Sequence, residues 1–233
     1  MKHKNILLGI LAIMFLQMSC VKEGPMEPLT TVSYASQPYD ELDVSNALKV
    51  MMSDTAQRIY VTCAESIAGR VKVNVHEHTL YLSLKAGTRT RQDVVVVLPR
   101  NEYLREVELS GASGFESDDT LSAHELTFSL SGASTLQAKV LTDELDVDMS
   151  GASKVTMEGS ATDVELELSG ASCFEGIGLV ANQVKAELSG ASKVSITCNT
   201  MLEVEASGAS TLMYGGTPFV KSTTTGGSTV KPY

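Results

Sequence analysis

Large aromatic side chains are almost missing from this 233-residue chain, which has no Trp and only 5% aromatic residues. Its hydrophobic fraction of 43% is nevertheless that of a folding protein, which excludes wholesale disorder. Small residues are abundant instead, with 18 Gly and 26 Ser. A core of bulky rings is therefore excluded, and the fold must be one that small and aliphatic side chains can fill.

Positive charge is also scarce. The chain has 18 Lys and Arg against 28 Asp and Glu, and its formal net charge is −10. Contacts with phosphate groups need clustered Lys and Arg, and no basic run lies beyond the first few residues. We therefore expect no nucleic-acid partner.

The first 20 residues have the layout of a secretory signal peptide. Lys2 and Lys4 precede an apolar run over residues 6–16, which is short for a membrane span. The segment LQMSC, which ends at Cys20, resembles a bacterial lipobox. That resemblance implies removal of residues 1–19, acylation of Cys20 as the lipid attachment site, and an outer-membrane lipoprotein that faces the periplasm or the outside. Ordinary signal cleavage, with Cys20 as a plain thiol, is the alternative.

Residues 20–38 contain three Pro residues and no periodicity, which is typical of a tether. Beyond Cys20 the chain keeps Cys63, Cys173 and Cys198, an odd number that permits at most one internal disulfide. No CxxC or Cys/His spacing indicates a metal, and the three residues are interpreted as fillers of the core or surface. We expect no cofactor.

An internal repeat indicates the fold. The tetrapeptide Ser-Gly-Ala-Ser occurs six times, a degenerate seventh copy reads Thr-Gly-Gly-Ser, and successive copies are 18 to 21 residues apart. Their first glycines are Gly111, Gly132, Gly151, Gly170, Gly190, Gly208 and Gly226. A period near 19 residues is too short for helical hairpins and fits one turn of a β-solenoid. Residues two and four before each glycine, and four after it, are mostly apolar, as expected for strands that alternate inward and outward. The predicted fold is therefore all-β, a right-handed single-chain parallel β-helix (β-solenoid) with about 19 residues per turn.

The tetrapeptide is best interpreted as a structural corner. Glycine tolerates a positive φ and the close approach of the next turn, alanine is expected to fill a corner with no room for more, and the serines can bond to the backbone. A ladder of serine hydroxyls that binds sugar or ice is the alternative. The outward positions just after the corner are chemically irregular, which favours the structural interpretation. No serine has a His and Asp partner set that indicates a nucleophile.

Odd positions before each corner form an acidic stripe on one outer face. It comprises Glu106, Glu108, Asp146, Asp148, Glu165, Glu167, Glu187, Glu203 and Glu205. Charge on a long parallel sheet prevents pairing with other chains, which is one explanation. Binding of a divalent cation or a basic partner is the other, although no Ca²⁺ loop signature is present. This stripe is the candidate partner-binding site.

His76 and His78 flank Glu77 at a predicted turn, and no site is assigned to them.

The N-terminal third also alternates like strands and is expected to begin or cap the solenoid. The stretches YDELDVSNALKVMMS, KVNVHEHTLYLSLKAG and VVVVLP, together with the iterated LSGAS turns, resemble the family described as putative auto-transporter adhesin, head GIN domain. The resemblance implies a β-helical domain of bacterial envelope proteins, mostly from Bacteroidetes, over residues 39–231. Within it, residues 39–105 are expected to be N-terminal strands or a cap, and residues 106–231 the repeats. It implies no catalytic residues.

Three classes of function follow. The first is a non-enzymatic cell-envelope lipoprotein, an adhesin or surface scaffold that binds an unknown protein or glycan and reaches the membrane through its lipid anchor. The second is a periplasmic accessory or sensor protein that binds another envelope protein. The third is a carbohydrate-active β-helix enzyme, which would need a basic residue beside a carboxylate cluster in a groove. Only Lys154, Lys185 and Lys193 lie near the stripe, so the non-enzymatic class is favoured.

Overall fold

The computed structural model describes residues 26–233 and is 65% strand and 3% helix. The predicted signal peptide and the predicted lipid attachment at Cys20 lie outside the described residues. The elements follow one another as β1 (Leu29–Tyr34), β2 (Glu41–Val44), β3 (Leu48–Ser53), β4 (Ile59–Ala64), the 3₁₀ helix η1 (Glu65–Arg70), β5 (Val71–His76), β6 (Thr79–Leu84), β7 (Val94–Pro99), β8 (Glu106–Leu109), β9 (Gly114–Leu130), β10 (Thr135–Met149), β11 (Lys154–Leu168), β12 (Cys173–Leu188), β13 (Lys193–Ala206), β14 (Thr211–Gly215), β15 (Phe219–Thr224) and β16 (Thr229–Pro232).

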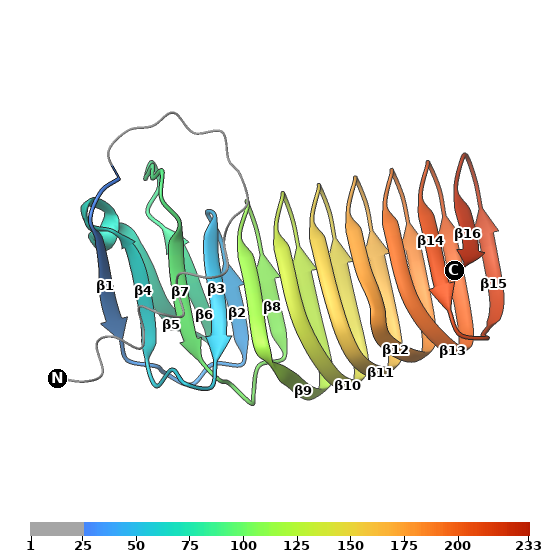
Figure 1. The fold of residues 1–233 in the computed structure, drawn as a ribbon, viewed down its shortest axis with the longest axis horizontal. Coiled ribbons are helices and arrows are strands. Elements are labelled where there is room, and N and C mark those ends of the chain that lie inside the picture. Colours follow the sequence, from blue (N-terminus) through green and yellow to red (C-terminus); the bar gives the residue numbers. More distant parts are fainter. Residues whose placement is uncertain (1–25) are drawn as a thin grey trace.

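The predicted parallel β-solenoid is confirmed, with about seven turns spaced about 19 residues apart. In the middle of the molecule each turn is one long strand, and β9 to β13 pair in parallel in sequence order. Figure 1 shows a narrow tip at one side of every turn, where the corner lies, and a rounded bend at the other. Each turn therefore has two flat faces. The leading face is the name used below for the strand segments that precede a corner. It consists of β2, β8, the C-terminal halves of β9–β13, and β15. The trailing face consists of the segments that follow a corner.

Inward-pointing side chains of the two faces fill one continuous core. In β11, Val155, Leu166 and Leu168 are each at most 2% exposed. Equivalent residues of successive turns are direct register partners, so that Leu166 lies between Val147 and Ala186. Each buried Val or Leu stabilises the fold by roughly 1.5–3 kcal/mol relative to exposure. Since the interior is narrow, aliphatic residues fill it, which explains the low aromatic content.

The corners explain why glycine recurs. Gly151 and Gly170 have φ of 75° and 74°, and a Cβ on Gly170 would lie 2.5 Å from the carbonyl oxygen of Gly151 in the turn before. That same oxygen accepts a 2.7 Å hydrogen bond from the N–H of Ala171. Successive corners therefore form a backbone ladder at a distance that excludes any side chain on the glycine.

The two other residue types of the corner do not play equal parts. The second serine is buried, as at Ser172 (1% exposed), and its hydroxyl donates a 2.8 Å bond to the carbonyl of Ser169 in the same corner. Corner serines of the other turns make the same bond. The expectation that alanine fills a tight corner is wrong, because Ala171 and its equivalents are exposed at the tip. The buried small residue is serine, since only its hydroxyl satisfies the carbonyl there.

Stacking starts earlier in the chain than the repeat does. Val44 of β2 pairs with Leu109 and Val50 of β3 pairs with Phe115, so residues 45–48 form a further corner in register with residues 110–113. Asn46 takes the place of glycine there, with φ of 67°. Asparagine is one of the few other residues that tolerate this conformation. The first turn therefore lies within residues 39–105, the segment that was expected to begin the solenoid or to cap it.

A cap of mixed strands closes the N-terminal end. β6 and β7 extend the two faces by parallel pairing with β2 and β3, and β5 and β4 then pair antiparallel to them. β1 pairs antiparallel with β4 at the outer edge. The predicted tether over residues 20–38 is thus wrong for residues 29–34, which are strand β1. β-Branched residues Thr30, Thr31 and Val32 favour a strand there, while Pro28 and Pro38 lie outside it.

Candidate functional site

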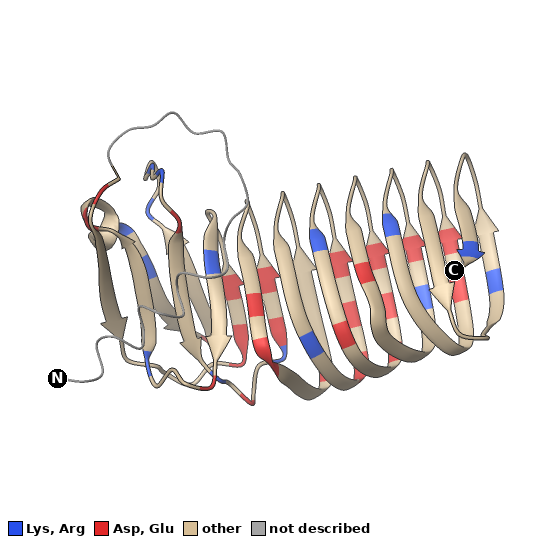
Figure 2. Cartoon of the chain, in the orientation of Figure 1, with Lys and Arg blue, Asp and Glu red and all other residues tan. Residues whose placement is uncertain are grey.

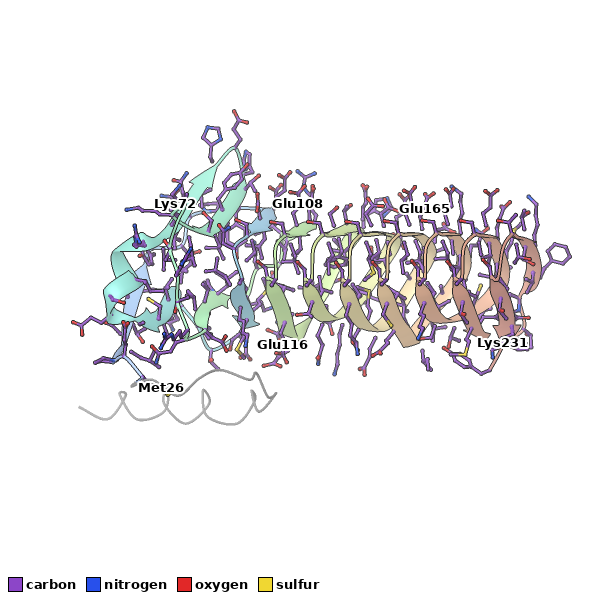
Figure 3. The ribbon with its side chains drawn as sticks, turned by 90° about the horizontal axis from the view of Figure 1, so that it is seen from above. Met26, Lys72, Glu108, Glu116, Glu165 and Lys231 are labelled. Carbon is purple, nitrogen blue, oxygen red and sulfur yellow. The ribbon has the colours of Figure 1, made fainter. Side chains whose placement is uncertain are left out.

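All nine residues of the acidic stripe lie on the leading face. Five stand three residues before a corner glycine, which we call the minus-three column: Glu108, Asp148, Glu167, Glu187 and Glu205. Four stand five residues before it, in the minus-five column: Glu106, Asp146, Glu165 and Glu203. Figure 2 shows the acidic residues recurring from strand to strand. In the view along the strands, Glu108 and Glu165 point from one face and Glu116 and Lys231 from the other (Figure 3).

Sequence reasoning missed further members of this face. Glu41 pairs with Glu106 and Asp43 with Glu108, so the first turn extends both columns. The signal was available, since residues 41–45 (ELDVS) match residues 106–110 (EVELS) once residues 45–48 are recognised as a corner. A third column, seven residues before the glycine, adds Glu125, Glu144 and Asp163, which are exposed register partners.

Lysines neutralise part of the minus-five column. Lys185 lies between Glu165 and Glu203 in register, and its Nζ is 2.5 Å from Glu165 and 3.2 Å from Glu187. These two carboxylates raise the pKa of Lys185. Lys221 pairs with Glu203 and thereby lowers the pKa of that carboxyl. Like-charge repulsion in this column is therefore relieved toward the C-terminal end.

Several carboxyls in the N-terminal half of the leading face have raised pKa values. Partial burial raises the pKa of Asp146, and the neighbouring carboxylates Glu165, Glu125, Asp148 and Glu144 raise it further. The pKa of Glu106 is raised in the same way, first by burial and then by Glu41 and Glu108. Burial alone raises the pKa of Asp43. A positive group bound to this face would relieve this repulsion, and charge of that kind attracts basic partners from solution.

A groove of about 810 Å³ runs along the leading face beside the row of corners. One side is lined by the minus-three column, from Asp43 to Thr223, and the other by the first serine of each corner, from Ser110 to Ser207, with Thr225 at the end. The groove spans eight stacked strand layers of the leading face, from β2 to β15, a length of roughly 34 Å at about 4.8 Å between layers. Its shape suits an extended chain with polar or basic groups rather than a compact small molecule.

A divalent cation fits the stripe poorly. Among residues 26–233 one group of three carboxylates, Glu165, Glu167 and Glu187, has oxygens close enough together to hold a metal ion. The ammonium of Lys185 already contacts two of the three. Lysine therefore takes the place that a hard cation would need.

The remaining candidate ligands do not converge. His76 and His78 flank Glu77 at the exposed β5–β6 turn, as predicted. Cys63, Cys173 and Cys198 are free thiols, two of them buried. No helix in the described part of the chain has the length and apolar character of a membrane span.

Solved structures of similar fold include proteins from Bacteroides and Parabacteroides. A putative adhesin from Bacteroides fragilis matches with a TM-score of 0.82 and 20% identity, covering 90% of this chain and 99% of its own. A putative adhesin from Parabacteroides distasonis gives a TM-score of 0.67 and 19% identity, covering 89% and 98%. A putative lipid binding protein from Parabacteroides distasonis gives 0.69 and 13%, covering 88% and 96%. Their names differ in function, so the shared fold does not identify a ligand.

No curated protein matches the chain. The family model described as putative auto-transporter adhesin, head GIN domain, matches residues 38–218, which include the first corner, the acidic stripe and most of the solenoid. The chain belongs to this family.

Proposed function

We propose that this protein is a non-enzymatic lipoprotein of the cell envelope that presents its solenoid as an adhesin-like binding surface, with the leading face as the part that contacts the partner. The groove along that face is the observation that carries the proposal, because it continues over eight stacked strand layers and is lined by repeated carboxylates and hydroxyls. The membership of an adhesin-named family supports the same role. The partner is a protein or glycan with an extended shape and with basic or hydroxyl groups.

The enzyme alternative receives less support from the geometry. A β-helix enzyme needs a basic residue beside a carboxylate cluster, and Lys185 has that position beside Glu165 and Glu187. However, these side chains are about half exposed and the lysine is held by two ion pairs. Such a solvated pair does not provide the water-excluded, perturbed site that polysaccharide cleavage requires.

Binding can be tested with the soluble form, residues 21–233, on a glycan array and on immobilised matrix proteins such as collagen and fibronectin. The test variant replaces three carboxylates of the minus-three column (D148N, E167Q and E205Q). The matched control removes three negative charges from the trailing face (E116Q, E158Q and E175Q). We expect the first variant to lose binding and the control to keep it. Equal binding by both variants, or the same loss in both, would overturn the assignment to the leading face.

The anchor and its side of the membrane need separate experiments. Cys20→Ser is expected to abolish incorporation of labelled palmitate, and incorporation by this variant would contradict lipidation at Cys20.

Protease treatment of intact cells is expected to degrade the protein if it faces outward. A protein that stays intact until the outer membrane is opened would instead favour the periplasmic accessory or sensor role.

A further inference from the structure

The outer surface of the trailing face changes character at the N-terminal cap. Along the repeats its outward residues are mostly polar, as at Lys154, Thr156 and Glu175. In β7, which extends this face, alternate residues fill the core, and the residues between them, Val95 and Val97, are apolar as well. Both valines point outward and are only partly buried. Neither the core nor the leading face accounts for them.

Neighbouring strands complete an apolar surface around the two valines. Met51 of β3 and Tyr60 of β4 are the register partners of Val97 on its two sides. Register partners point to the same side of a sheet, so these three side chains form one outward row. Val95 lies in the next row, and Leu29 of β1, 54% exposed, lies at the edge of the same side. We call Leu29, Met51, Tyr60, Val95 and Val97 the cap patch.

The cap patch lies on the side of the molecule where the N-terminal segment enters the cap. Figure 3 shows Met26 on the same side as Glu116 and opposite Lys72. Met51 is the register partner of Glu116, so the cap patch faces that side too. The predicted lipid attachment at Cys20 precedes Met26 by six residues, and six residues span at most about 21 Å. A lipid at Cys20 therefore keeps the cap patch within reach of the membrane surface.

We propose that the cap patch is a membrane contact, with its side chains at the boundary between the phospholipid headgroups and the acyl chains. Apolar side chains of surface-bound proteins insert at this boundary, and Tyr, which has an apolar ring and a polar hydroxyl, is enriched there. Met26, which is 84% exposed, extends the apolar contact beyond the sheet. The inference rests on the proposed function in one respect, since the lipid at Cys20 is what brings the cap to the bilayer.

The charges of the two faces agree with this orientation. When the cap patch points toward the membrane, the acidic stripe of the leading face points away from it (Figure 3). On the trailing face, Glu158 is paired with Lys139 and Glu175 with Lys154. A bilayer that contains anionic lipids therefore repels the leading face more strongly than the trailing face. The same orientation leaves the groove of the leading face open to a partner.

Two outward tyrosines of the cap provide a matched test, because the chain has no Trp of its own. Tyr60→Trp places a single fluorophore in the cap patch, and Tyr81→Trp places one on the opposite side, where Tyr81 of β6 is 39% exposed. Residues 21–233 with an N-terminal His tag are bound to vesicles of phosphatidylcholine, phosphatidylglycerol and a nickel-chelating lipid, with or without brominated acyl chains. We expect brominated chains to quench Tyr60→Trp about threefold or more relative to Tyr81→Trp.

A charge in the cap patch tests whether the patch itself makes the contact. Val97→Glu, added to Tyr60→Trp, is expected to abolish the quenching by brominated chains, because a carboxylate is costly at the acyl boundary. Ser83→Glu, on the outward side of β6, is the matched control and is expected to leave the quenching unchanged. Equal unfolding midpoints of the two variants would show that both fold.

Three results would overturn the proposal. The first is equal quenching of Tyr60→Trp and Tyr81→Trp, or stronger quenching of the latter. The second is an equal effect of Val97→Glu and Ser83→Glu. The third is a concentration-dependent blue shift of Tyr60→Trp without quenching by brominated chains, which would show that a second copy covers the cap patch. Because the tag replaces the natural anchor, none of these results depends on lipidation at Cys20, which the palmitate experiment decides separately.

Discussion

Replacing one corner glycine by alanine tests the close approach of successive corners. Gly170 lies in a middle turn with φ of 74°, and a Cβ there would be 2.5 Å from the carbonyl oxygen of Gly151 and 3.1 Å from its nitrogen. Gly111 offers a matched control. Its φ is 78°, but the nearest atom to its Cβ would be the nitrogen of Asn46 at 3.4 Å, an ordinary contact. Alanine at either position would therefore have the same unfavourable positive φ, but only at Gly170 would its Cβ also collide with the backbone of the preceding turn.

The expected costs follow from these distances. A left-handed conformation costs alanine about 1 kcal/mol, and this is the whole expected effect of Gly111→Ala. In Gly170→Ala the oxygen of Gly151 must also move, which weakens its 2.7 Å bond from the N–H of Ala171 and shifts the next bond, from the N–H of Ala191 to Gly170. Two such bonds contribute about 2 kcal/mol together. The total for Gly170→Ala is thus about 3 kcal/mol.

Thermal unfolding of residues 21–233, followed by circular dichroism, measures this difference. For a chain of this size 1 kcal/mol corresponds to about 2–4 °C, so Gly170→Ala is expected to lower Tm by roughly 6–12 °C and Gly111→Ala by roughly 2–4 °C. Ala171→Val, at an exposed tip, is expected to stay within about 0.5 kcal/mol of the wild type. Equal losses in the two glycine variants would refute the role of close stacking, and a large loss in Ala171→Val would refute the exposed placement of alanine.

Four further predictions concern the corner serines and the leading face. Ser172→Ala leaves the carbonyl of Ser169 without its donor and is expected to cost about 1 kcal/mol in urea unfolding. Because the pKa of Asp146 is raised in the folded state, its stabilising contribution is present below its unfolded pKa of about 3.9 and is lost as pH rises through the folded pKa. Asp146→Asn is therefore expected to stabilise the protein at neutral pH and to have little effect at acid pH. The pKa of Glu203 is lowered in the folded state, so Glu203→Gln should destabilise the protein at neutral pH, and this effect should fade as pH falls through the folded pKa. A change of stability with the same sign in Asp146→Asn and Glu203→Gln at neutral pH would contradict the opposite pKa shifts of these two carboxyls. Lys185→Gln frees Glu165 and Glu187, which form a group of three carboxylates with Glu167. The variant is expected to bind Ca²⁺ more tightly than the wild type in calorimetry, and equal affinities would contradict the interpretation that the lysine fills the cation position.

Most of the solenoid could be predicted from the sequence because its contacts are between equivalent residues. A recurring Gly with apolar residues at even positions specifies the corner, the inward columns and the parallel register at once, and the structure confirms the β-solenoid. The corner at residues 45–48 was not recognised, because Asn46 replaces glycine and Leu48 replaces the buried serine. Residues 29–34 were assigned to a tether, since a single edge strand has no repeat to mark it.

For the candidate site too, some features could be predicted from the sequence and others required the structure. The alternation of charged and apolar residues places the carboxylates on one face, since each step of two residues along a strand returns to the same side. Its extension by Glu41 and Asp43, and the partial neutralisation by Lys185 and Lys221, depend on which residues of different turns lie side by side. Those pairings join residues about 20 or more positions apart, and bulges within the strands shift them by one or more residues.

The sequence by itself therefore determined the repeating turn, the inward and outward columns and the acidic character of one face, because a solenoid repeats a local pattern. Only the tertiary structure decided how the N-terminal end is closed, which carboxylates are paired, and that serine rather than alanine is buried in the Ser-Gly-Ala-Ser corners. These features arise from contacts between turns, where backbone distance and hydrogen bonding select among small residues that look equivalent in the chain.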